Sequence, residues 1–306
     1  MARDKLDPVP FFSNWSGHPV SDLSVAFEAV QNVRSSQSIV YFAGDSSLDN
    51  KAWVPSYDSS SQETVPAIYG SFLEPAHPKP DVAYWLNYHL GEKATCLNAA
   101  VEASLLRHRD GGLLPQDEFI HDHIRSQDVL IVSVGANDIA LSPNIATMFQ
   151  MVRLTRLTSR KSLEDGSAGS LQYFKWLFGN QVQSYISRLV AKQKPRAIIV
   201  CMIYFPLEEE QKGWASLQLK LLGYNQNPGQ LQIAIRKIFE QATMQIEIEG
   251  TEVLPCALFE ALDGKTRTDY VERVEPSVEG GDKMARRFHN LLEPILKIPT
   301  KAGKNQ

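Results

Sequence analysis

Residues 38–50, SIVYFAGDSSLDN, are the stretch that decides the fold of this chain. Residues 39–43 are apolar and rich in strand-forming types, and the run stops at Gly44, where Asp45 and Ser46 follow directly. A buried strand ending in polar residues is typical of an open α/β sheet, whose chemistry lies at the carboxyl ends of its strands. We interpret Ser46 as a candidate nucleophile, presented by a sharp turn whose backbone angles Gly44 permits. A plainer interpretation is a helix N-cap, which Asp and Ser also favour.

Four further apolar runs follow, separated by helical patterns, at residues 94–97, 128–135, 197–202 and 252–256. Such alternation predicts a parallel sheet covered on both faces and joined by right-handed crossovers. We therefore expect a three-layer α/β/α sandwich with a five-stranded parallel sheet of the flavodoxin-like type. The predicted helices cover residues 20–33, 103–127, 143–160, 171–191, 208–221, 229–245 and 277–296. A further helix is capped by Asp81 and carries Val82, Trp85, Leu86 and His89 on one face.

The expected organisation is one domain with additions. Residues 1–37 would form an extension that packs on the core, residues 38–300 the domain itself, and residues 301–306 a disordered tail. A Ser- and Pro-rich stretch at 53–79 reads as a long loop inserted after the first strand. Loops near strand ends often shape binding sites, so we expect this insertion to do so.

Composition narrows the classes of function. The 306 residues are 43% hydrophobic and carry a net charge of −4, with a pI near 6.0. This balance gives no general attraction to nucleic acid, and no run approaches the ~20 apolar residues of a membrane span. We expect a cytoplasmic protein with a small-molecule substrate, no nucleic-acid partner and no stable membrane insertion.

Three cysteines, Cys96, Cys201 and Cys256, lie in or beside apolar strand-like runs. Burial as small hydrophobic residues fits this placement better than disulfide or metal bonding, and indicates a reducing compartment. The sequence has no Gly-rich phosphate loop and no zinc-type spacing of Cys and His. We therefore expect neither a cofactor nor a metal.

Polar blocks follow the other predicted strands in a definite order. Residues 98–104 follow the second strand, 135–138 the third, and 272–280, ERVEPSVEG, precede the last helix. Together with Gly-Asp-Ser they resemble the SGNH, or GDSL-type, hydrolase family, whose blocks are Gly-Asp-Ser, Asn-x-Gly-x-x-Gly, Gly-x-Asn-Asp and a late Asp-x-x-His-Pro. The resemblance covers roughly residues 38–296, and the order of the blocks at strand ends is more specific than any one block.

The resemblance implies a role for each matching residue. Ser46 would be the nucleophile, and its amide one donor of an oxyanion hole. Ala103 stands at the family's oxyanion glycine, where only a backbone N–H is needed, and the Asn137 side chain would complete the hole. The plainer interpretation of Asn137 with its neighbour is a helix cap. We assign three further residues of these blocks to substrate binding: Asp45, Gly135 and Asp138.

The last block departs from the family pattern. Asp-x-x-His appears as Glu272 to Glu275, while Pro276, Ser277 and Gly280 are retained. The pKa of a free histidine suits proton exchange with serine near neutral pH, whereas a free glutamate, near ~4.3, is a poor base for an alcohol. The family's standard triad therefore cannot be written on this chain.

Three interpretations of this departure remain open. Glu275 can itself be the base, with a pKa raised by burial and by Glu272. A histidine from elsewhere, His77 or His289, can replace it, although histidines are more often packing or surface residues. Finally, the site can bind a ligand without turnover, or hold Mg²⁺ or Ca²⁺ among Asp45 and the two glutamates.

Residues 148–154 add an amphipathic pattern, with Met148, Met151, Val152 and Leu154 opposite basic residues. Packing on the core is the plain interpretation, and an acyl pocket or a membrane contact are the others. We expect an ester or acyl substrate, cleaved or transferred by an esterase, lipase or acyl transferase through Ser46, with Glu275 in the base position. The alternative is a protein of the same fold that binds a small ligand or a cation without hydrolysis.

Overall fold

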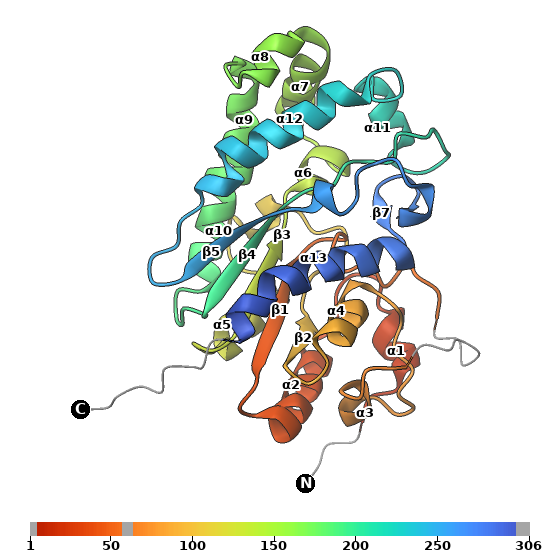
Figure 1. The fold of residues 1–306 in the computed structure, drawn as a ribbon, viewed down its shortest axis with the longest axis vertical. Helices are drawn as coiled ribbons and strands as arrows, with labels where there is room; N and C mark the ends of the chain where they lie inside the picture. Colours follow the sequence, from red (N-terminus) through yellow and green to blue (C-terminus); the bar gives the residue numbers. More distant parts are fainter. Residues whose placement is uncertain (1–4, 57–63, 298–306) are drawn as a thin grey trace.

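A five-stranded parallel sheet forms the centre of the molecule (Figure 1). The structure is a computed structural model and describes residues 5–56 and 64–297. The strand order is β2-β1-β3-β4-β5, and every neighbouring pair is parallel. The strands match the five predicted runs: β1 Ser38–Gly44, β2 Ala94–Asn98, β3 Val129–Ser133, β4 Ala197–Met202 and β5 Glu252–Ala257.

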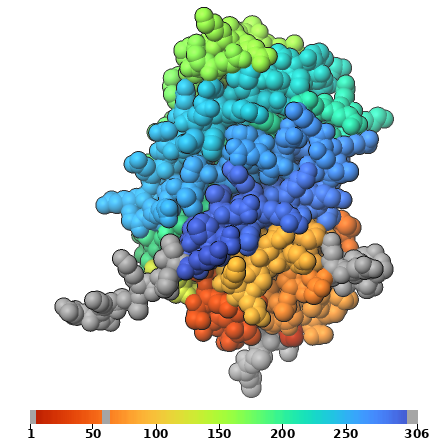
Figure 2. Space-filling model, viewed as in Figure 1, coloured from red at the N-terminus to blue at the C-terminus, as the bar shows by residue number. Residues whose placement is uncertain are grey.

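Helices cover both faces of this sheet. Every residue of β1, β2, β3 and β4 is buried, which requires a layer on each side. On one face α4 (Val82–Leu90) packs against α13 (Val278–Leu296), and Figure 2 shows the blue α13 beside the orange segment that contains α4. On the other face α5 (Pro115–His123) contacts α2 (Val20–Arg34) and α10 (Val182–Leu189). The predicted α/β/α sandwich is confirmed.

Two predicted helices are shorter than expected. The predicted helix at 208–221 is reduced to α11 (Ser216–Leu221), because the chain before it bonds to distant segments. Leu207 N–H donates to the Arg273 carbonyl at 2.8 Å, and Glu208 N–H donates to the Gly264 carbonyl at 2.7 Å. The predicted crossover helix at 103–127 contains only the short η1 (Leu106–Arg109) and α5, with Gly112 left-handed between them at φ 158°.

Two other predicted helices contain π-helical turns. Residues 143–160 form α7 (Ile145–Val152) and the π-helical η2 (Arg153–Leu157), and residues 171–191 hold η4 (Trp176–Gln181) between α9 and α10. The remaining helices are α6 Ala136–Ala140, α8 Arg160–Glu164, η3 Gly169–Leu171, α9 Gln172–Lys175, α12 Pro228–Gln241, η5 Thr243–Gln245, η6 Leu258–Glu260 and η7 Arg267–Asp269.

The segments around the core domain also pack on it. The helix α1 (Pro8–Ser13) supplies buried Phe11 and Phe12 to the core cluster, and Leu6 pairs with Leu73 in an isolated bridge. The insertion is not only a loop: its described part contains α3 (Tyr69–Phe72), which also enters this cluster. The predicted tail, residues 301–306, lies outside the described residues.

The three cysteines are buried and free, as predicted. Cys201 and Cys256 are paired across neighbouring strands β4 and β5, and Cys96 lies on β2. Within residues 5–56 and 64–297, no helix is long and apolar enough to cross a membrane.

Candidate active site

Ser46 lies in a tight turn that directly follows β1. Asp45 N–H donates to the Ser133 carbonyl at 3.1 Å, and the Asp45 carbonyl accepts the amides of Leu48 and Asp49 at 3.0 and 2.9 Å. Gly44 precedes the turn, but its backbone is not left-handed. A Cβ at this position would lie 2.3 Å from the Ser133 oxygen. Glycine is therefore required by the closeness of β3, and not by special backbone angles as the sequence suggested.

Asp45 is buried beside the serine. Its Oδ1 accepts hydrogen bonds from Ser47 N–H at 3.1 Å and Ser47 Oγ at 2.8 Å, while Oδ2 is buried with no hydrogen-bond partner. Burial raises the pKa of the Asp45 carboxyl to about 6, against the lowering effect of the Ser47 bonds. The pKa of this carboxyl thus lies closer to neutral pH than that of a free aspartate.

A short hairpin carries Glu275 to the same place. The strands β6 (Tyr270–Val271) and β7 (Glu275–Pro276) pair antiparallel, with Val271 opposite Glu275. The three-residue connection bends sharply because Glu272 and Arg273 have left-handed φ angles of 51° and 75°. Few residues other than glycine adopt such backbone angles, so surrounding contacts must hold this bend.

The fully buried Arg273 side chain supplies those contacts. Its Nε and Nη2 donate to the Leu207 carbonyl at 3.1 and 3.0 Å, and Nη1 donates to Asn225 Oδ1 at 3.0 Å. The hairpin is thereby bonded to the segment between β4 and α12. Arg273 thereby helps to fix the hairpin that carries Glu275.

Glu275 is buried among other acids. Burial is the largest cause that raises the pKa of its carboxyl well above the ordinary value, and the charges of Glu102 and Asp45 add to it. Hydrogen bonds from the side chains of Ser46 and Trp214 act in the opposite direction. Glu275 Oε2 is buried without a hydrogen-bond partner. A carboxyl with a raised pKa thus contacts the candidate nucleophile.

Glu272 has a different place from the one predicted. Its Oε2 accepts the Trp214 backbone N–H at 3.2 Å, and Glu272 is not among the largest causes of the raised pKa of Glu275. The neighbouring carboxylates that act on Glu275 are Glu102 and Asp45. Glu272 instead positions the segment that carries Trp214.

The loop after β2 runs beside β1 toward Asn137. Ala99 N–H donates to the Phe42 carbonyl and Val101 N–H to the Gly44 carbonyl, both at 3.0 Å. Ala103 is left-handed with φ 58°. The family that this sequence resembles has a glycine at this position, and glycine adopts a left-handed conformation most readily. Asn137 Nδ2 donates to the Ser104 carbonyl at 3.1 Å. An amide has two hydrogens, so this bond leaves the second for a ligand.

Gly135 and Asp138 act on the loops around Asn137. Gly135 is left-handed with φ 99°, and a Cβ there would lie 3.0 Å from the Phe178 ring, so only glycine fits at the start of α6. Asp138 Oδ2 accepts the Leu106 N–H at 2.6 Å and so fixes the start of η1. Both residues position their neighbours.

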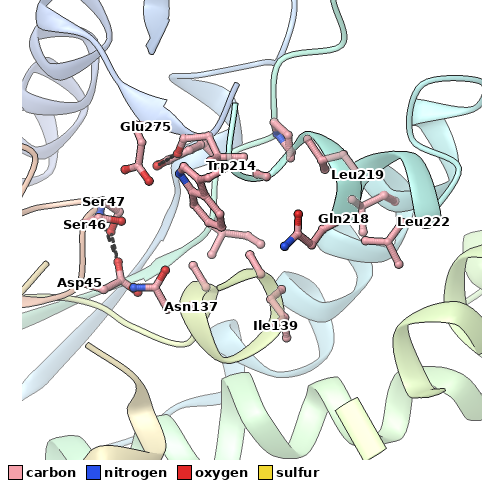
Figure 3. Close-up of a pocket in the computed structure, with 18 of the residues that line it drawn as sticks. Asp45, Ser46, Ser47, Asn137, Ile139, Trp214, Gln218, Leu219, Leu222 and Glu275 are labelled. Carbon is pink, nitrogen blue, oxygen red and sulfur yellow. Dashed lines mark hydrogen bonds between the residues drawn. The ribbon is translucent and has the colours of Figure 1, made fainter. Parts of the chain in front are cut away.

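A cavity of about 100 Å³ opens at Ser46. Four of the predicted site residues line it: Asp45, Ser46, Asn137 and Glu275. In Figure 3 these polar side chains lie together at one end, with Trp214 beside Glu275, and apolar side chains form the other end. The remaining predicted site residues do not line it: Ala103, Gly135, Asp138 and Glu272.

The described part of the 53–79 insertion does not line this cavity either, contrary to our expectation. It lines a separate hollow with α1, and His77 belongs to that hollow. His289 lies on α13, with its ring 6.1 Å from that of His89. None of the residues that line the cavity at Ser46 is a histidine. Among the described residues, no group of three or more His, Cys, Asp or Glu side chains is able to hold a metal ion.

Sequence reasoning missed three residues of this site. Glu102 stands in a block that was recognised, but nothing in the sequence shows that burial raises its pKa to about 8. Tyr204 is the second residue after β4, just as Ser46 is the second residue after β1, and it could have been found by the same argument. Trp214 fell inside a predicted helix and gave no signal.

No family model and no curated protein matches this sequence. Solved structures that match include a carbohydrate acetylesterase from Sinorhizobium meliloti, with 12% identity, 85% of this chain and 100% of that chain covered, and a TM-score of 0.45. An acetyl xylan esterase from Geobacillus stearothermophilus matches with 15% identity, 86% and 97% coverage, and a TM-score of 0.41.

An alpha/beta hydrolase from the metagenome of Lake Arreo, Spain, matches with 14% identity, 84% and 94% coverage, and a TM-score of 0.43. By their descriptions these three proteins are esterases or hydrolases. At these identities and TM-scores the matches assign no activity to this chain.

Proposed function

We propose that this protein is a serine hydrolase of the SGNH type that acts on carboxylic ester bonds through Ser46. The observation that carries the proposal is the contact between the Ser46 hydroxyl and Glu275, a carboxyl whose pKa is raised, in a cavity also lined by Asn137. A raised pKa brings a glutamate closer to the range in which a base exchanges protons efficiently near neutral pH. The buried site thus compensates for the missing histidine.

The proposed reaction has two halves. Ser46 Oγ attacks the ester carbonyl carbon as its proton passes to Glu275, and the oxyanion accepts hydrogen bonds from the amide of Ser46 and the side chain of Asn137. The intermediate collapses to an acyl-Ser46, and the alcohol leaves with the proton from Glu275. Water then attacks the acyl carbon and loses its proton to Glu275, which returns it to Ser46 as the carboxylic acid departs.

Labelling with a fluorophosphonate, followed by peptide mapping, tests this proposal. We expect one modified peptide, carrying Ser46, and no labelling of the Ser46→Ala variant. Ser47→Ala is the matched control. Ser47 Oγ bonds to Asp45 and Ser133 and is not the proposed nucleophile, so this variant should still be labelled at Ser46. Labelling of another residue, or undiminished hydrolysis of aryl esters by Ser46→Ala, contradicts the assignment of the nucleophile.

A binding protein of the same fold is the second candidate. It is favoured by one observation: a glutamate replaces the family's histidine, and no histidine lines the cavity. Absence of both labelling and ester hydrolysis in the folded protein would support it.

The three buried free thiols support a reducing compartment such as the cytoplasm.

A further inference from the structure

The apolar end of the cavity continues away from Ser46 into a second hollow of about 20 Å³. The two hollows share six apolar side chains, so only these side chains separate them: Ile139, Met151, Ile203, Leu222, Leu231 and Ile235. They come from α6, α7, the chain after β4, and the region of α11 and α12. The two hollows therefore adjoin, and together we call them the apolar passage.

Buried residues close the far end of this passage. Phe174, Phe178, Met202 and Ile238 line the second hollow, and each is buried. Gln218 is a polar exception on the wall of the first hollow, and Figure 3 shows its amide pointing into the cavity. Apolar walls with a closed end favour a linear aliphatic group and exclude a second polar group at its tip.

The acyl side of an ester fits this passage better than the alcohol side. The leaving alcohol must take its proton from Glu275, so it lies on the side of the hairpin. We place the acyl group on the other side, past Asn137 toward Ile139 on α6, both of which line the cavity. The acyl group also stays bonded to Ser46 after the alcohol has left, so a closed passage does not obstruct the reaction.

We infer that the substrate is an ester of an aliphatic acyl chain longer than acetyl, and that the passage between α6, α7, α11 and α12 binds this chain. The inference rests on the proposed function. Each buried methylene contributes about 0.8 kcal/mol, which is about a fourfold change in affinity. The amphipathic pattern of residues 148–154 is consistent with this wall: Met151 and Leu154 are buried and line the passage, whereas Met148 and Val152 are 49% and 41% exposed.

A chain-length series of p-nitrophenyl esters, from acetate to decanoate, tests the inference. We expect kcat/KM to rise about fourfold per methylene until the passage is full. Leu222→Phe fills the passage where the two hollows meet, and should lower kcat/KM for the longer esters at least tenfold while acetate changes less than about twofold. Leu231→Phe provides a second variant on another helix. Leu221→Phe is the matched control, because Leu221 is 56% exposed and lines neither hollow.

Binding of neutral 2-alkanones, from acetone to 2-decanone, gives a readout without turnover. A ketone is the suitable probe because the buried acids at Ser46 oppose a charged carboxylate. Affinity that rises with chain length and falls in Leu222→Phe supports the passage even if no ester is hydrolysed, in which case only the proposed function fails. Hydrolysis that is indifferent to chain length, with ketone affinities equally flat, overturns the inference and leaves the esterase proposal standing.

Discussion

Glu275 stands where the resembling family has a histidine, and its surroundings change its chemistry. A free histidine has a pKa near ~6.5 and a free glutamate near ~4.3. Burial and the charges of Glu102 and Asp45 move the pKa of Glu275 upward, while the hydrogen bond from Ser46 favours its ionised form. The surroundings therefore move the pKa of this glutamate toward that of a histidine.

Replacing Glu275 by glutamine tests this base directly. The amide keeps the shape of the side chain but accepts no proton, so ester hydrolysis should fall by a factor on the order of 10² to 10⁴. In the parent protein the rate should rise with pH through a pKa well above that of a free glutamate, because only the ionised carboxylate accepts the serine proton. A pH-rate profile of kcat/KM measures this. Unchanged activity in Glu275→Gln, with the fold intact by circular dichroism, excludes Glu275 as the base.

The close approach of β3 leaves no room for a side chain at Gly44. A Cβ there would contact the backbone oxygen of Ser133, which cannot rotate away, so Gly44→Ala should destabilise the fold by about 1–3 kcal/mol. Gly70→Ala is the control, since nothing lies within 4 Å of a Cβ at Gly70. Urea unfolding compares the two variants. Equal stabilities would show that β1 and β3 separate without cost at this point.

At the scale of elements, the site depends on segments that are bonded to one another far from the sheet. The hairpin of β6 and β7 positions Glu275, and Arg273 ties it to the segment before α11. Trp214 in that segment is in turn bonded to Glu272. Ser277 is the N-cap of helix α13, and its side chain accepts the Gly280 N–H, so the start of this helix is fixed close to the proposed base.

The helix α4, which packs on α13, offers a test at this scale. Its N-cap Asp81 accepts the Tyr84 N–H at 2.7 Å, and burial raises the pKa of this carboxyl to about 7. Asp81→Ala should lower the free energy of unfolding by about 0.5–2 kcal/mol, whereas Asp81→Asn keeps a capping oxygen and should cost little. Thermal unfolding at pH 6 distinguishes them. Identical midpoints for the two variants would mean that the cap contributes nothing to stability.

At the scale of the whole molecule, the main hydrophobic core of the described residues extends from Phe11 to Ile295, and several carboxyl groups are buried in the fold. We propose that residues 38–300 form the hydrolase domain, with residues 1–37 as an extension. Burial raises the pKa values of Asp45, Asp81 and Glu102 to about 6, 7 and 8. The fold therefore retains protons that the unfolded chain releases.

These raised pKa values predict how stability depends on pH. Below about pH 4 both states are protonated and the contribution is fully present; as pH rises, the unfolded chain binds fewer protons, so stability is lost through about pH 8. Each such group changes the free energy of unfolding by at most about 1.4 kcal/mol per pH unit. Melting temperatures from pH 5 to 9 should fall, and Glu102→Gln should flatten the fall between about pH 6 and 8. A parallel curve for this variant contradicts the assignment.

The sequence by itself determined the sheet and the position of Ser46. Apolar runs and the polar residues that end them are local patterns, and the carboxyl ends of parallel strands necessarily share one edge. The retained Pro276, Ser277 and Gly280 likewise placed Glu275 before the last helix. Each of these inferences needs only neighbouring residues.

The tertiary structure alone decided what surrounds these residues. Glu102 and Trp214 reach Glu275 from distant segments, and Glu272, adjacent in sequence, faces another partner. The cavity is walled by α6, α7, α11 and α12, whereas the long insertion that seemed suited to the task lies elsewhere. A pKa and a cavity both depend on which side chains exclude water from a point in space, and that is a property of the packed chain, which no local pattern encodes.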